Sequence, residues 1–104
     1  MKKVIRDGKV AVLYSPEYGA GWYTWGLPIE AVFHPRLVEL VEQNRREEIT
    51  QELIDDLFCA NDYNVGGARD LEIMWVDEWE SFMIEEYDGF ESIIFKKNMK
   101  WLKA

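Results

Sequence analysis

The segment YGAGWYTWG, from Tyr18 to Gly26, has the residue types of a site for a planar small molecule, because it places four aromatic rings and three glycines within nine residues. Tryptophan and tyrosine offer flat faces with a polar edge on which a base can stack, and glycine lets the backbone approach a ligand closely. We therefore predict ligand contacts from four side chains of this segment: Tyr18, Trp22, Tyr23 and Trp25. The alternative, which the sequence leaves open, is that the tryptophans cover the open face of a sheet and belong to the core.

A second glycine pair, Gly66-Gly67, is followed by Arg69, and this combination is typical of a site for an anion. The backbone N–H groups of a glycine loop and a guanidinium both bind negative charge. If the two glycine segments lie together, aromatic stacking plus Arg69 would suit a nucleotide-like ligand. The structural alternative for Arg69 is a salt bridge, either to Asp70 or to the two glutamates described next.

Glu86 and Glu91 are predicted to face each other across a β-hairpin near the end of the chain. The Asp88-Gly89 pair between them is a strong signal for a two-residue turn, because both turn positions need a positive φ. This register makes Glu86 and Glu91 direct cross-strand neighbours on one face. Like charges in that position are unfavourable, so we expect either that both carboxylates turn into water or that a cation, an arginine or a partner group lies between them.

The sequence carries no signature of catalysis or of a cofactor. His34 is the only histidine and Cys59 the only cysteine, so the counts exclude a histidine metal cluster, a thiolate cluster and an internal disulfide. Neither a phosphate-binding lysine motif nor a complete dinucleotide-binding glycine motif is present. We predict no catalytic residue, no metal and no cofactor, and a capping or packing role for His34 beside Pro35.

Turn residues and hydrophobic spacing predict the elements that must position these groups. Asp7-Gly8 indicates a hairpin whose second strand is apolar on both faces, and helical spacing begins at Pro35. A capping-box pattern at Asn44 and Glu47 predicts the start of the next helix. The expected elements are strands at about 2–6 and 9–14, helices from 35 to near 44 and from there to about 59, a strand over LEIMWV, the hairpin at Asp88-Gly89 and a short last strand MKWLK.

Strands are thus segregated from helices along the chain, which favours an α+β fold. We predict a mostly antiparallel sheet, made of the N-terminal hairpin and three C-terminal strands, with two helices on one face. The length of 104 residues suits a single domain, 1–104, and 48% hydrophobic residues are enough for one core.

The charge of the chain limits its partners. Twelve basic and twenty acidic residues give a net charge of −8, which repels a nucleic-acid backbone and an anionic membrane. No apolar run has the length of a signal peptide core or of a membrane span. We therefore expect a cytoplasmic protein without direct nucleic-acid or membrane contacts, and the five tryptophans leave a homodimer open.

Three segments, VLYSPEYGAGWYTW near the start and GGARDLEIMWV and EEYDGFESI near the end, carry a resemblance to a known group. They resemble segments of small accessory proteins encoded by bacteriophages and prophages, and the resemblance covers most of the chain. It implies a viral protein that acts in the bacterial cytoplasm by binding and blocking a host component. It implies no reaction and no catalytic residues.

Three functions follow from these observations. In the first, the aromatic segment and Arg69 bind and sequester a nucleotide-like small molecule, such as a host defence signal. In the second, the acidic outer faces of the two helices imitate nucleic acid and block a basic groove on a host protein. In the third, Glu86 and Glu91 act as the acid and base of an enzyme. We rank binding above enzymatic activity.

Overall fold

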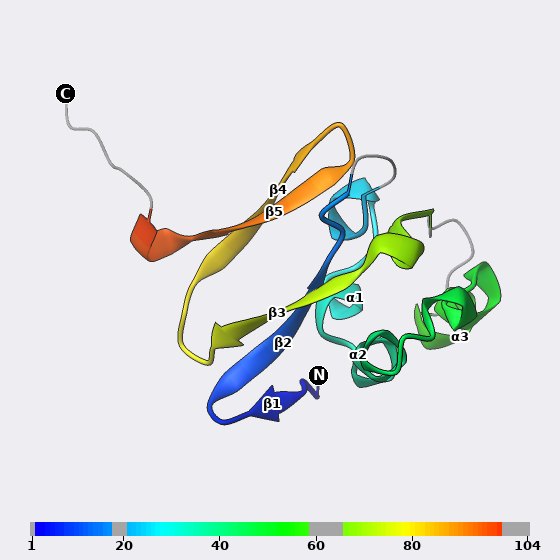
Figure 1. Cartoon of the computed structure of the whole chain (residues 1–104), viewed down its shortest axis with the longest axis horizontal. Coiled ribbons are helices and arrows are strands. Elements are labelled where there is room, and N and C mark those ends of the chain that lie inside the picture. The colour runs from blue at the N-terminus through cyan, green and yellow to red at the C-terminus, as the bar shows by residue number, and fades with distance from the viewer. Residues whose placement is uncertain (1, 18–20, 59–65, 99–104) are drawn as a thin grey trace.

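A three-stranded antiparallel sheet lies at the centre of the computed structural model, which describes residues 2–17, 21–58 and 66–98. Its strands are β1 (Ile5–Arg6), β2 (Lys9–Tyr14) and β3 (Glu72–Asp77), and β2 lies between the other two (Figure 1). The predicted N-terminal hairpin is confirmed, although β1 is shorter than expected.

A separate hairpin of β4 (Phe82–Tyr87) and β5 (Phe90–Phe95) forms the second sheet. Its register pairs Glu86 with Glu91, as the sequence predicts. Both Asp-Gly turns have the positive φ values that a two-residue hairpin needs, 51° and 75° in the first and 53° and 86° in the second. Turn chemistry alone therefore fixed the pairing that brings the two glutamates together.

The division of the strands into two sheets corrects the expected single sheet, and the residues of β2 explain it. Ala11 and Leu13 are buried in one apolar cluster, whereas Val10 and Val12 are buried in another. Helices cover the first of these faces, so the second also needs a cover, and the hairpin of β4 and β5 folds across it. The α+β class is confirmed, with the C-terminal hairpin as a layer of its own.

Helices α2 (Pro35–Glu42) and α3 (Gln51–Phe58) form the layer on the first face of the sheet (Figure 1). Their apolar stripes enter the same cluster as Ala11 and Leu13, through Leu37, Val38, Leu40, Val41 and Ile54. A further short helix, α1 (Glu30–Phe33), was not predicted. It supplies Val32 and Phe33 to the cluster beneath the hairpin and thereby joins the two layers.

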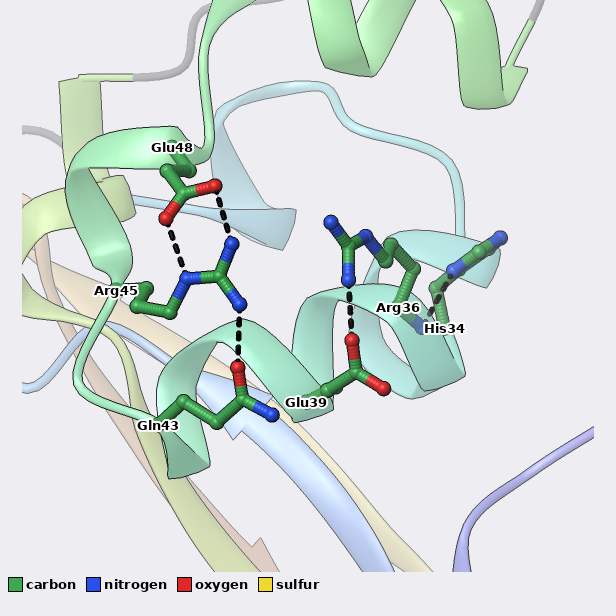
Figure 2. Close-up of polar contacts among 6 residues, drawn as sticks. All are labelled: His34, Arg36, Glu39, Gln43, Arg45 and Glu48. Carbon is green, nitrogen blue, oxygen red and sulfur yellow. Dashed lines mark hydrogen bonds and ion pairs between the residues drawn. The ribbon is translucent and has the colours of Figure 1, made fainter.

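His34 begins α2 in the capping role that the sequence indicates. Its Nδ1 accepts a hydrogen bond from the backbone N–H of Arg36 at 3.1 Å, and Pro35 occupies the first helical position (Figure 2). Partial burial lowers the pKa of His34 and so favours the neutral ring, which this bond requires.

The predicted capping box at Asn44 and Glu47 is wrong, because the helix that follows begins later. Thr50 Oγ1 accepts the backbone N–H of Leu53 at 3.3 Å, at the start of α3. Asn44 instead has a φ of 56°, a left-handed conformation that stops α2. The predicted last strand MKWLK lies outside the described residues.

Candidate functional site

Trp22 belongs to the core, so its predicted role as a stacking surface for a ligand is wrong. The side chain is fully buried, and its Nε1 donates a hydrogen bond to the carbonyl of Ala31 at 3.0 Å. A buried indole needs such a partner for its N–H, and this one ties the aromatic segment to α1. The alternative of a tryptophan that plugs the sheet describes Trp22 correctly. Tyr18 lies outside the described residues.

Glu91 has neither of the two expected surroundings, because its carboxylate is buried among donors of the aromatic segment. One oxygen accepts the backbone N–H of Ser15 at 2.8 Å. The other accepts the backbone N–H groups of Trp22 and Thr24, both at 2.9 Å, and the Thr24 hydroxyl at 2.7 Å. The Glu91 side chain is fully buried. A carboxylate closed to solvent and surrounded by four donors holds the loop and has no oxygen free for acid–base work on a substrate.

Glu86, the cross-strand partner of Glu91, also binds this segment. Its Oε2 accepts Trp25 Nε1 at 2.6 Å and the backbone N–H of Gly89 at 3.0 Å. A Cβ atom on Gly21 would lie 2.5 Å from Trp25 Cδ1, so the glycine permits this close packing. Trp25 stays 41% exposed. Residues 21–26 of the aromatic segment are thus bound to the hairpin by two carboxylates.

Arg69 lies apart from the aromatic segment. It is exposed and lines a polar cavity of about 630 Å³ together with Arg46, Gly66 and Ala68. The Arg46 guanidinium is already engaged there, since its Nε donates to the carbonyl of Leu71 at 2.7 Å. None of Trp22, Tyr23 and Trp25 lines this cavity, so within the described residues the structure does not combine Arg69 with the aromatic segment into one site.

A second cavity, of about 580 Å³, lies between α1 and β4 and does include one predicted contact, Tyr23. Its walls are mainly apolar, and Phe33 and Phe82 meet there edge to face with ring centroids 6.4 Å apart. This volume is in the range of cavities that hold small organic ligands. The exposed side chains of Ile29 and Met83 add apolar surface to the lining.

Two charged groups of opposite sign line this α1–β4 cavity. The ammonium of Lys3 lies 4.3 Å from the centroid of the Phe33 ring. Glu80 Oε1 is closed to water and receives no hydrogen bond from the described residues. Lys97 Nζ is 3.6 Å from that oxygen, which is beyond hydrogen-bonding distance. The cavity therefore combines aromatic walls, a cation and a carboxylate that is short of donors.

The alternation of residues before β4 could have predicted that Glu80 faces inward. Glu80, Phe82 and Ile84 alternate along the chain, so the strand period of two extends the inward face of β4 back to the glutamate. Phe82 and Ile84 pack against the cluster beneath the hairpin. No sequence pattern could have predicted the position of Lys3, because its place beside Phe33 depends on a contact between distant parts of the chain.

The outer side of α2 and of the turn that follows it carries several ion pairs. Arg36 pairs with Glu39, and Arg45 binds both carboxylate oxygens of Glu48 (Figure 2). Arg45 also lowers the pKa of Glu48 through these bonds. A further pair joins Arg6 of β1 to Glu42. This side of the protein therefore presents paired charges of both signs.

Comparison with known proteins adds no family to these observations: no protein-family model, curated protein or solved structure matches the chain. Within the described ranges, no helix is long and apolar enough to cross a membrane. Over the same residues, no three side chains of histidine, cysteine, aspartate or glutamate come together in a way that would hold a metal ion.

Proposed function

We propose that this chain is a non-enzymatic binding protein that sequesters a small planar anion of nucleotide type in the α1–β4 cavity. The observation that carries the proposal is the convergence of three aromatic side chains, Tyr23, Phe33 and Phe82, with the ammonium of Lys3 in a cavity of about 580 Å³. The ligand class is the one that the sequence suggests, whereas the site lies beside the aromatic loop and takes its cation from Lys3 in place of Arg69.

The physical support for this ligand class comes from the two kinds of surface in the cavity. Aromatic and aliphatic walls favour a flat ring, because burying its faces removes apolar area from water. A lysine ammonium beside that ring attracts a phosphate or another anionic group. On a protein with a net charge of −8, such a local cation is also needed to offset repulsion of an anion.

The setting that we propose is the cytoplasm of a bacterial host, in line with the resemblance to small phage proteins, where sequestering a nucleotide signal would counter a host defence. The acidic inhibitor of a host protein is the second candidate. It ranks lower because Glu39, Glu42 and Glu48 each contact an arginine, and paired charges imitate a phosphate backbone poorly.

Thermal unfolding against a panel of mono-, di- and cyclic nucleotides tests the proposal. A ligand at about 100 times its dissociation constant should add roughly 2.7 kcal/mol to the free energy of unfolding. The charge reversal Lys3→Glu should abolish the shift, and the matched reversal Arg69→Glu, at another exposed cation, should leave it unchanged. No shift with any nucleotide, or a shift that depends on Arg69 and not on Lys3, would overturn the assignment of this cavity.

A further inference from the structure

We infer that the α1–β4 cavity selects ligands whose planar ring carries an amino group, and that Glu80 is the residue that recognises this group. The inference rests on the proposed function and names the ligand class within it. It is supported by a different observation, the hydrogen bonding of Glu80, whereas the proposed function is supported by the aromatic walls and Lys3.

The carboxylate of Glu80 is short of hydrogen-bond donors. Buried polar atoms in proteins are hydrogen-bonded in the great majority of cases, and a buried acceptor without a donor is unfavourable. Glu80 Oε1 is closed to water and has no hydrogen bond within the described part of the chain. The Glu80 side chain is 17% exposed, whereas that of Lys97, at 3.6 Å, is 63% exposed and so remains largely solvated. A donor from a ligand would supply the missing bond once the Glu80 side chain turns this oxygen into the cavity.

The backbone around Glu80 is held in position by hydrogen bonds. The N–H of Glu80 donates to the carbonyl of Asp77 at 2.9 Å, which closes the turn after β3. The carbonyl of Ser81 accepts the N–H of Lys96 at 2.9 Å, which continues the pairing of β4 with β5. The backbone is thus hydrogen-bonded on both sides of Glu80, and rotation about the side-chain torsions of Glu80 would bring the carboxylate to a donor in the cavity.

An ionised carboxylate accepts hydrogen bonds and donates none. A ring amino group gives it an N–H donor. A ring carbonyl at the same position would place one acceptor against another. Nucleotides differ from each other in this way: adenine and cytosine carry an amino group where hypoxanthine and uracil carry a carbonyl. A hydrogen bond to a charged group contributes about 1.5–3 kcal/mol, which corresponds to a preference of roughly 10- to 100-fold.

Calorimetric titration of the intact protein with matched pairs of nucleotides tests this inference. The pairs are adenosine against inosine monophosphate, and cytidine against uridine monophosphate. We expect the amino member of each pair to bind about 10- to 100-fold more tightly. In Glu80→Gln the preference should fall toward equality, because an amide both donates and accepts. In Glu85→Gln, a matched change at an exposed glutamate of β4, the preference should persist.

The outcomes separate the inference from the function on which it rests. Equal affinity within each pair for the unchanged protein would overturn the role of Glu80 while the cavity stays the binding site. A preference that survives Glu80→Gln would also overturn it. The absence of binding by all four nucleotides would overturn the inference and the proposed function together.

Discussion

Glu91 and Glu80 are both largely buried glutamates at the two ends of the same hairpin, yet their surroundings are opposite. The carboxylate of Glu91 accepts four hydrogen bonds, three from the aromatic segment and one from the backbone N–H of Ser15. Glu80 Oε1 accepts none from the described residues, and Glu80 is one of the residues that line the α1–β4 cavity. A carboxylate whose bonds are complete holds the fold together, whereas we propose that one that lacks donors beside a cavity receives a donor from a ligand.

This difference also explains the aromatic segment, which by its composition is the most conspicuous part of the sequence. Trp22 fills the core, and the N–H groups around it face Glu91. In the described part of the segment, the backbone N–H groups of Trp22 and Thr24 bind Glu91 and the Trp25 indole binds Glu86, so these bonds hold the segment to the hairpin. The cavity beside it draws its walls from residues that no local motif connects, among them Phe33 and Phe82.

The largest effect that we expect comes from breaking the complete set of bonds, with Glu91→Gln. The amide nitrogen of glutamine is a donor, so in either orientation it would face at least one of the N–H groups that now donate to the carboxylate. The loss of charge-assisted bonds and the unpaired donors should lower the free energy of unfolding by about 3–5 kcal/mol. Urea denaturation measures this loss, and Glu85→Gln on the exposed side of β4 is the control, with a change within about 0.5 kcal/mol. A Glu91 variant as stable as this control would contradict the role of Glu91.

Features that depend on neighbouring residues could be predicted from the sequence, whereas contacts between distant residues could not. The Asp-Gly turns, the pairing of Glu86 with Glu91 and the cap at His34 depend on neighbouring residues, and all three are confirmed. The surroundings of Glu91 depend on Ser15 and Trp22, which lie 76 and 69 residues away in the sequence. Such contacts form only when two layers pack, so no spacing in the sequence predicted them.

The two-layer arrangement was missed for a similar reason. The apolar residues on both faces of β2 predicted a strand covered on both sides, and this is confirmed. These residues did not predict which element packs on the second face of β2. Both the hairpin and α1 contribute to it, and the four residues of α1 are too few to produce a helical period in the sequence.

A smaller effect is expected at a cap on the surface, which sharpens the comparison with the buried carboxylate. His34→Ala removes the acceptor for Arg36 N–H and should cost about 1 kcal/mol near neutral pH. Because burial lowers the pKa of His34, the folded state binds protons less readily than the unfolded state. The contribution of His34 is therefore complete above the ordinary pKa of 6.5 and is lost as pH falls through the lower, folded-state pKa.

Unfolding curves of the wild type and of His34→Ala between pH 5 and pH 8 check this expectation, with His34→Asn as the control that keeps a capping acceptor but does not titrate. The stability difference between wild type and His34→Ala should narrow toward acid pH, while His34→Asn should show no such pH dependence relative to alanine. A difference that stays constant from pH 8 to pH 5 would contradict the neutral capping role.

The most direct measurement is the free energy of unfolding of Glu80→Gln, made beside that of Glu91→Gln without ligand. Because Glu80 Oε1 accepts no hydrogen bond from the described residues and its ion pair with Lys97 is loose, the variant should keep the wild-type stability within about 0.5 kcal/mol. That result would agree with a carboxylate that the fold does not need. A loss as large as that of Glu91→Gln would show that Glu80 holds the fold together too, and would contradict its assignment to a binding site.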